Sequence, residues 1–187
     1  MQSAARQPGA PCAPIATTAR LTLREIDAAD APFILTLVND PAWLRFIGDK
    51  NVRTQSDACR YIEAGPAAMY AQRGFGLWLA ERSEDGVPIG MCGLIKRDAL
   101  PDIDLGFAFL PAYRGNGYAF EAAQAATDFA WGRLGLGRVV AITAPDNDDS
   151  VRLLERLGFR FERMLRLSDD APAVRLYAAR RPRSPED

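Results

Sequence analysis

The segment from residue 103 to residue 144 constrains the fold more than any other part of the chain. It begins with the apolar run IDLGFAFL, continues through the glycine loop YRGNG and an alanine-rich segment, and ends with RVVAITA. Its two ends have the apolar and β-branched composition of strands, and the middle is apolar on most sides of a helix. We expect the second strand to be central and parallel to the first. The chain is therefore expected to form an α/β domain around this unit.

The other patterns add strands and helices on both sides of this unit. Further strands are predicted at residues 19–26, 75–82, 87–97, 159–167 and 173–180. Further helices are predicted at residues 28–40, from Thr54 or Ser56 to an interruption at Gly65–Pro66, from Tyr118 to about Leu134, and from Asn147 or Asp148 to Gly158. Their order is β-α-α-β-β-β-α-β-α-β-β, and Gly106 is expected to mark a bulge in its strand.

The composition excludes several kinds of chemistry. Hydrophobic residues make up 48% of the chain, charged residues 25%, and the net charge is −1, so no bulk attraction to nucleic acid or to an anionic membrane is expected. The sequence contains no histidine, which rules out imidazole bases and His-containing metal sites. Cys12, Cys59 and Cys92 are too far apart for a CxxC metal site, and Cys92 reads as a core residue. We expect no metal.

Both ends of the chain read as tails. We predict a flexible N-terminal tail at residues 1–18, one domain at residues 19–181 and a C-terminal tail at residues 182–187. The chain has no run of 18 apolar residues, and prolines interrupt its start where a signal peptide would have an apolar core. The expected location is cytoplasmic.

The glycine loop is a candidate anion site. It lacks the Gly-Lys pair of a P-loop, and Phe120 stands where a dinucleotide fingerprint needs its third glycine. Backbone N–H groups of residues 115–119 lie at a helix N-terminus, where they would face an anion. Gly115 and Gly117 permit left-handed backbone angles, and Arg114 could add a charge-assisted hydrogen bond. The alternative is an ordinary strand-to-helix turn.

A second pattern, NDDSVRLLERLGF, opens the next helix. Asn147 and Ser150 are three residues apart, so both face the start of that helix, and its apolar stripe includes Leu154. The alternative is that Asn147 is a helix cap and Ser150 an ordinary first-turn residue.

These two patterns together resemble the motifs of GNAT-superfamily N-acetyltransferases, in the branch of the ribosomal-protein N-terminal acetyltransferases. The residues that match the family's two motifs, Q/R-x-x-G-x-G/A and N-x-x-S followed by G-F, are Arg114, Gly117, Ala119, Asn147, Ser150, Gly158 and Phe159. The resemblance covers residues 19–180. It implies the GNAT fold of the α/β (α+β) class, with a mixed central sheet of about six to seven strands and flanking helices.

The same resemblance implies that acetyl-CoA donates an acetyl group to a primary amine, which attacks directly in a ternary complex. The amine would belong to a protein N-terminus or a small molecule. The pantetheine arm would lie between the strands at residues 103–110 and 138–144, and one N–H would polarise the thioester carbonyl. The coenzyme-binding residues implied are Phe107, Ala108, Phe109, Arg114, Gly115, Asn116, Gly117, Tyr118, Ala119, Asn147 and Ser150.

The attack of an amine on the thioester needs a base that removes a proton from the amine. An alkyl amine has a pKa near 10.4, so supplying its neutral form near pH 7 costs roughly 4 kcal/mol. Relatives place an acidic residue on the strand before the loop, which makes Asp104 our candidate base, with Asp102 as an open alternative. Asp104 could also be a solvent-facing strand residue. Ser150, positioned with Asn147, is the expected partner of the leaving thiolate.

The remaining candidates concern the rim of the site. We expect Glu121 to be structural, and Arg152 and Arg156 to form a solvated helix face rather than a clamp for the coenzyme's 3′-phosphate. Candidate walls of the acceptor site are Trp43, Phe46, Tyr61, Trp78 and Phe107. The expected partners are acetyl-CoA and an amine, and we expect no binding to nucleic acid or membrane. The protein is expected to be a monomer or a homodimer. The competing function is a non-catalytic acyl-CoA sensor or interaction module.

Overall fold

The computed structural model describes residues 13–182. The parts of the predicted tails at residues 1–12 and 183–187 lie outside the described residues. None of the helices in the described part of the chain combines the length and the apolar character needed to cross a membrane.

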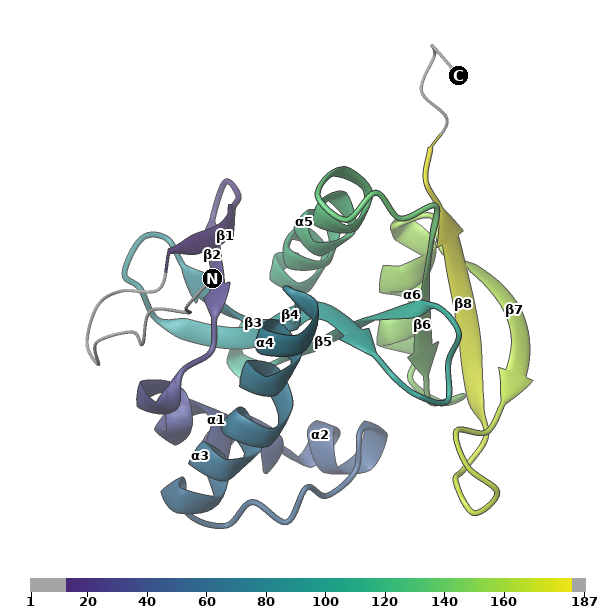
Figure 1. Cartoon of the computed structure of the whole chain (residues 1–187). Helices are drawn as coiled ribbons and strands as arrows, with labels where there is room; N and C mark the ends of the chain where they lie inside the picture. Colours follow the sequence, from purple (N-terminus) through teal and green to yellow (C-terminus); the bar gives the residue numbers. More distant parts are fainter. Residues whose placement is uncertain (1–12, 183–187) are drawn as a thin grey trace.

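Eight strands form one sheet in the order β1-β2-β3-β4-β5-β6-β8-β7 (Figure 1). The strands are β1 (Pro14–Thr17), β2 (Leu21–Glu25), β3 (Leu77–Arg82), β4 (Pro88–Lys96), β5 (Ile103–Phe109), β6 (Arg138–Thr143), β7 (Arg160–Leu165) and β8 (Val174–Arg180). Neighbouring strands are antiparallel except β5 and β6, which are parallel as predicted. The sheet is therefore mixed.

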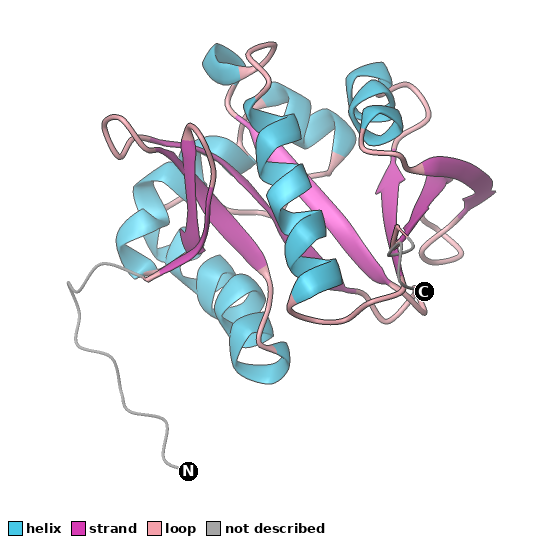
Figure 2. Cartoon of the chain, turned by 90° about the horizontal axis from the view of Figure 1, so that it is seen from above, coloured by secondary structure: helices cyan, strands magenta, loops and turns pink. Residues whose placement is uncertain are grey.

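Helices cover both faces of this sheet. They are α1 (Ala31–Val38), α2 (Pro41–Phe46), α3 (Gln55–Ile62), α4 (Ala68–Arg73), α5 (Tyr118–Gly132) and α6 (Asp148–Arg156). Figure 2 shows the long helix α5 crossing one face of the sheet. Its alanines belong to the same core cluster as Trp78 and Leu105. On the other face, α1 and α3 pack with Leu79 and Met91. Side chains on β5 alternate between these two layers.

The strand β1 was not predicted, and it brings the sheet to eight strands instead of six to seven. Residues 14–17, assigned above to a flexible tail, pair antiparallel with β2 at the edge of the sheet. The segment is four residues long, begins with a proline and has no apolar alternation, so its own sequence does not indicate a strand. Pairing with β2 makes it one.

Two helix boundaries also differ from the predictions. The segment 28–40 divides into a short 3-10 turn (Ala28–Asp30) and α1, and a separate helix, α2, follows with Asp40 as its N-cap. Gly65–Pro66 does not end the second helical segment, because a π-helical turn (Glu63–Ala67) carries the chain on into α4. The wider turn accommodates the missing N–H and the ring of Pro66.

The bulge predicted at Gly106 is wrong. The pairing of β4 with β5 is continuous from residue 103 to residue 109, with Gly106 opposite Gly93. A Cβ atom at Gly106 would lie 2.8 Å from Cδ1 of Ile95. The glycine therefore makes room for the Ile95 side chain.

The close approach of β4 to the backbone just before β3 yields a first prediction. A Cβ atom at Gly93 would lie 2.1 Å from the carbonyl oxygen of Gly76, whereas one at Gly132 would meet nothing within 4 Å. Gly93→Ala should lower the free energy of unfolding by about 1–3 kcal/mol, because backbone must shift to admit the methyl group. The control Gly132→Ala should leave it unchanged or raise it by up to about 1 kcal/mol. Urea denaturation measures both, and equal stabilities would contradict the packing described.

Candidate active site

The two parallel strands separate immediately after they meet. β5 is paired with β4 from residue 103 to residue 109, but its pairing with β6 consists of Asp104 opposite Val140. Beyond that pair, the edge of β5 that faces β6 has no strand partner within the described residues. Between residues 105 and 109, every second residue directs its backbone groups to this edge, where a bound chain-like ligand can use those that are free. The Phe109 carbonyl is an exception, because it accepts a hydrogen bond from Arg114.

The glycine loop follows directly at the end of this free edge. Gly115 and Gly117 have φ angles of 76° and 83°, which confirms the left-handed conformations predicted for them. Within the described part of the chain, the N–H groups of residues 115–120 have no hydrogen-bond acceptor, and the first helical bond runs from Glu121 N–H to the Gly117 carbonyl. Successive free N–H groups ahead of a helix form a concave anion site.

Arg114 is engaged elsewhere than expected. Its Nε donates to the Phe109 carbonyl at 2.8 Å, and its Nη2 donates to Oδ1 of Asp40 at 2.6 Å. Asp40 also accepts hydrogen bonds from the first turn of α2. Arg114 thus joins the end of β5 to the N-terminus of α2, and an anion in the loop would rely mainly on backbone N–H groups.

Asp104 lies at the point where the strands part. Its side chain is only 1% exposed, so it is not the solvent-facing residue of the alternative reading. Arg97 Nε donates to Oδ2 at 2.6 Å, while Oδ1 has no hydrogen-bond partner among the described residues. Burial raises the pKa of Asp104 to about 6, against the lowering effect of the Arg97 charge. A carboxylate with such a pKa can exchange a proton near neutral pH.

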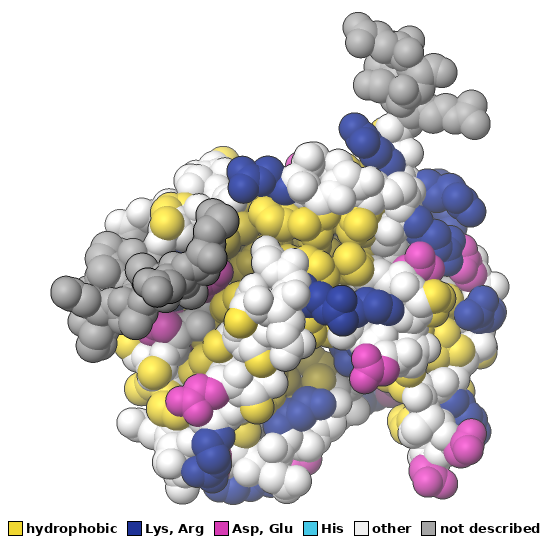
Figure 3. Space-filling view, in the orientation of Figure 1, with side chains coloured by type: hydrophobic (Ala, Val, Ile, Leu, Met, Phe, Trp, Pro, Cys, Tyr) yellow, Lys and Arg dark blue, Asp and Glu magenta, His cyan; other side chains and the backbone are white. Residues whose placement is uncertain are grey.

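Asp102, the open alternative, belongs to a surface network. Arg138 Nε donates to it at 3.0 Å, and the other guanidinium nitrogens of Arg138 bind Glu162. Asp102 therefore forms an ion pair with Arg138 at the rim of the sheet. Figure 3 shows Lys and Arg side chains interspersed with Asp and Glu on the visible face.

Asn147 is the N-cap of α6, as one of the two readings held. Its Oδ1 accepts the N–H of Ser150 at 3.2 Å. The Ser150 hydroxyl has no hydrogen-bond partner within residues 13–182, and the side chain is half-buried. The cap therefore fixes the first turn of α6 and leaves one hydroxyl available to a ligand.

Comparisons with known proteins bear on this arrangement. Residues 20–160 match the family described as Acetyltransferase (GNAT) domain. The chain belongs to the GNAT acetyltransferase family. It is 31% identical over 156 residues to the uncharacterized N-acetyltransferase YoaA of Bacillus subtilis, which covers 82% of this chain and 86% of YoaA.

Solved structures share the fold of this GNAT acetyltransferase. An acetyltransferase from Agrobacterium tumefaciens superposes with a TM-score of 0.77 at 26% identity, over 95% of this chain and 100% of that one. RimL, a ribosomal α-N-protein acetyltransferase in complex with coenzyme A, superposes with a TM-score of 0.77 at 20% identity, over 90% of this chain and 98% of RimL. The expected fold is confirmed.

The two arginines of α6 differ from each other in this GNAT domain. Arg152 pairs with Asp149 on the exposed face, as expected for a solvated side chain. The Arg156 guanidinium lies 4.4 Å from the ring centroid of Phe120 on α5. Arg156 and Phe120 line a cavity of about 690 Å³ that reaches Gly117. Arg156 is thus packed beside the glycine loop.

Two of the five aromatic candidates, Trp43 and Trp78, are buried in the core. Trp78 is 1% exposed and stacks edge-on against Phe129, so it does not face an acceptor. Trp43 is 5% exposed, and its Nε1 has no partner among the described residues. Tyr61 is half-buried, and burial raises its pKa to about 12. Of the five candidates, Phe46, Tyr61 and Phe107 keep partly exposed rings.

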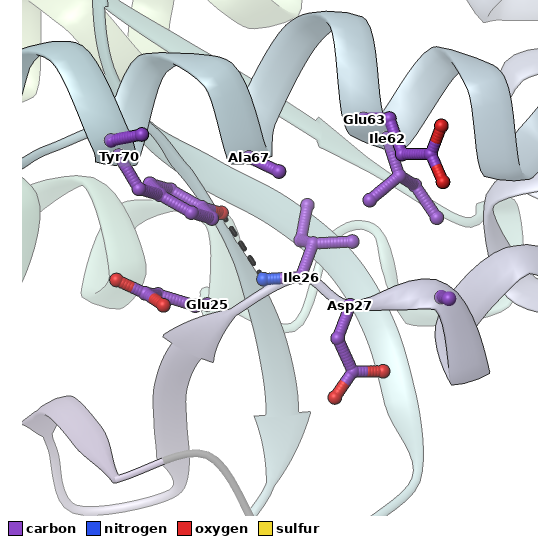
Figure 4. Close-up of a pocket in the computed structure, with 9 residues that line it drawn as sticks. Glu25, Ile26, Asp27, Ile62, Glu63, Ala67 and Tyr70 are labelled. Carbon is purple, nitrogen blue, oxygen red and sulfur yellow. Dashed lines mark hydrogen bonds between the residues drawn. The ribbon is translucent and has the colours of Figure 1, made fainter. Parts of the chain in front are cut away.

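A second cavity, of about 450 Å³, contains none of the predicted site residues. It lies between the end of β2 and the α3–α4 segment. Figure 4 shows the carboxylates of Glu25, Asp27 and Glu63 pointing apart, while the Tyr70 hydroxyl accepts the Ile26 N–H. Within the described residues no group of three or more Asp, Glu, Cys or His side chains could hold a metal ion.

Three residues near the site were missed from the sequence: Arg20, Asp40 and Arg97. The pairing of Lys96 with Ile103 places Arg97 near Asp104. This pairing follows from the turn length, so the hairpin register could have revealed Arg97. The contacts of Arg20 and Asp40 join residues 96 and 74 positions apart, and no local pattern indicates them.

The burial of Asp104 has a consequence for stability. Because its pKa rises from 3.8 to about 6 on folding, the native state binds more protons than the unfolded state between those values. The free energy of unfolding should therefore fall as pH rises through that window. Asp104→Asn should remove this fall, so the stability difference between wild type and variant should change with pH. Urea titrations from about pH 4 to pH 7 measure it. A pH-independent difference would exclude the shift.

Proposed function

We propose that this GNAT acetyltransferase transfers the acetyl group of acetyl-CoA to a primary amine by direct attack in a ternary complex. The amine belongs to a protein N-terminus or to a small molecule. The main support for the proposal is that free backbone groups continue from β5 into the glycine loop. The edge of β5 that faces β6 is unpaired, and in the loop that follows, the N–H groups of residues 115–120 lack acceptors among the described residues.

The coenzyme side of the site rests on these groups. The N–H groups of residues 115–119 hold the diphosphate, with the N-terminus of α5 behind them. Main-chain groups of residues 107–109 bind the pantetheine arm in the manner of an added strand. RimL, which has the same fold, is solved with coenzyme A. Bound acetyl-CoA supplies the thioester carbonyl that accepts the amine.

The proton balance gives Asp104 its role. The amine nitrogen forms a bond to the acetyl carbon, the carbon–sulfur bond breaks, and one proton leaves the nitrogen. Asp104, held at the strand junction by Arg97, receives that proton through a water molecule, because it lies below the surface. Its pKa of about 6 suits a base that works near neutral pH. The Ser150 hydroxyl donates a hydrogen bond to the leaving sulfur.

The acceptor approaches beside α2. Arg114 and Asp40 tie one end of this helix to the glycine loop, and Arg45 and Asp146 tie its other end to the loop before α6 at 2.7 Å. α2 thereby joins the two segments that flank the strand separation. Phe46 on α2 and Tyr61 on α3 are the partly exposed aromatic rings available to an acceptor on this side.

A thiol-release assay with an amine panel tests the proposal. Acetyl-CoA is supplied with peptides of free N-terminus, polyamines, amino sugars and amino acids. We expect release of free coenzyme A with at least one class, and a value of kcat/KM that rises with pH through about 6. Tight coenzyme binding without release for any amine would instead support the sensor function.

The variant Asp104→Asn serves as the internal control of that assay. It should lower kcat by about 10²-fold or more, since general bases contribute on this scale. It should also remove the inflection near pH 6. An unaltered pH–rate profile would eliminate Asp104 as the base and leave acetyl transfer itself in place.

The diphosphate site is tested by Gly117→Val. Gly117 and Gly135 both have left-handed backbone angles, with φ of 83° and 63°. A side chain at either position costs about 1–3 kcal/mol of backbone strain, so Gly135→Val is a matched control for stability. Calorimetry with coenzyme A should show affinity lost by about tenfold or more for Gly117→Val and retained for Gly135→Val. Equal affinities would place the diphosphate elsewhere.

A further inference from the structure

We propose that Arg20 is a positioning residue that holds the glycine loop in its diphosphate-binding conformation. The inference rests on the proposed function. Arg20 lies in the turn between β1 and β2, far from the loop in the sequence, and no motif marks it.

One side chain reaches several parts of the loop. Nη1 of Arg20 donates to the Asn116 carbonyl at 3.0 Å, and Nε and Nη2 contact Oε2 of Glu121 at 2.8 and 2.7 Å. The guanidinium also lies 4.5 Å from the ring centroid of Tyr118. Its Nη2 would be 3.3 Å from a Cβ atom at Gly117. Arg20 thus contacts the loop on both sides of the second glycine.

The loop needs such an anchor because of its own composition. Asn116 stands between two glycines in left-handed conformation, and glycine has more backbone freedom to lose than any other residue. The hydrogen bond to the Asn116 carbonyl fixes the peptide unit between them. With that carbonyl held by Arg20, the loop retains one backbone conformation before a ligand arrives, which lowers the entropic cost of binding.

Arg20 also binds the carboxylate of Glu121, which lies beside the proposed anion site. Glu121 is in the first turn of α5, where its charge would repel a diphosphate. Arg20 neutralises it through two guanidinium nitrogens, and the Arg20 N–H and the Thr18 hydroxyl donate to Oε1 at 2.8 and 2.5 Å. Both carboxylate oxygens are therefore turned toward the β1–β2 turn and bound there.

The turn itself is built to hold this contact. The Thr18 N–H donates to the Leu21 carbonyl at 2.8 Å, and the Leu21 N–H donates to the Thr18 hydroxyl at 2.9 Å. Each guanidinium nitrogen of Arg20 has a contact with Asn116 or Glu121. The residue consequently acts through the loop rather than as a direct ligand of the diphosphate.

The test compares two probes, coenzyme A and pantetheine, because pantetheine lacks the diphosphate. Arg20→Ala should weaken calorimetric affinity for coenzyme A by about tenfold or more and change that for pantetheine by less than about twofold. Arg20→Lys should also weaken the affinity for coenzyme A and leave that for pantetheine unchanged, because a single ammonium group cannot span Asn116 and Glu121. Arg73→Ala, on the exposed end of α4, removes the same charge and should change neither affinity.

Three outcomes would overturn the inference. Wild-type affinity for coenzyme A in Arg20→Ala would show that the loop holds itself. Equal losses for both probes in the alanine and lysine variants would show general structural damage. Full recovery in the double variant Arg20→Gln with Glu121→Gln would show that charge alone matters. If the wild-type protein binds no coenzyme A, the proposed function fails instead, so the two failures are distinguishable. If Arg20→Ala does not fold, Arg20→Lys decides the matter.

Discussion

The structure depends on a parallel pairing that stops after one residue pair. β5 and β6 meet at Asp104 and Val140 and then separate, yet each strand stays fixed because its other edge is fully paired. β4 holds β5 along its whole length, and β8 holds β6 from residue 138 to residue 143. A sheet can therefore keep two unpaired inner edges without losing its order. Unpaired backbone groups inside a sheet are costly unless a ligand or water binds them, so this arrangement favours an extended ligand.

The helix α2 links the two segments on either side of this gap, and its two links differ in strength. Asp40 has a 5% exposed side chain that binds Arg114 and also caps the helix, so losing either partner would leave a buried charge unbalanced. Arg45 and Asp146 are 64% and 60% exposed, and such a pair contributes at most about 1 kcal/mol. The helix is thus anchored firmly on the side of the glycine loop and loosely on the side of α6.

The sequence allowed prediction of what is local. Seven strands, the loop conformation at its two glycines and the cap at Asn147 follow from patterns within about ten residues of each other. What could not be predicted depends on distant partners. β1 is a strand because β2 pairs with it, and Arg20 contacts Asn116, 96 residues away. The π turn that carries the chain past Pro66 has no signal in the local sequence, where Gly-Pro normally ends a helix. In the candidate site, the resemblance made Asp104 the candidate base, whereas its burial and its partner Arg97 required the structure.

Asp104 is a buried charged residue in an apolar strand, which is unusual for a core position. The strand that carries it is otherwise apolar, and its neighbour Leu105 is fully in the core. The other buried carboxylates make more hydrogen bonds. Asp30 binds Arg24 with both oxygens, and Asp40 caps a helix. Among these three carboxylates, only Asp104 has a buried oxygen, Oδ1, without a hydrogen-bond partner among the described residues. A packed core gains nothing from such an oxygen, and a hydrophobic residue of similar size would remove the cost. Its position at the strand separation agrees with the proposed role of Asp104 as the proton acceptor, because buried polar groups that break the packing rules of a core are expected at functional sites.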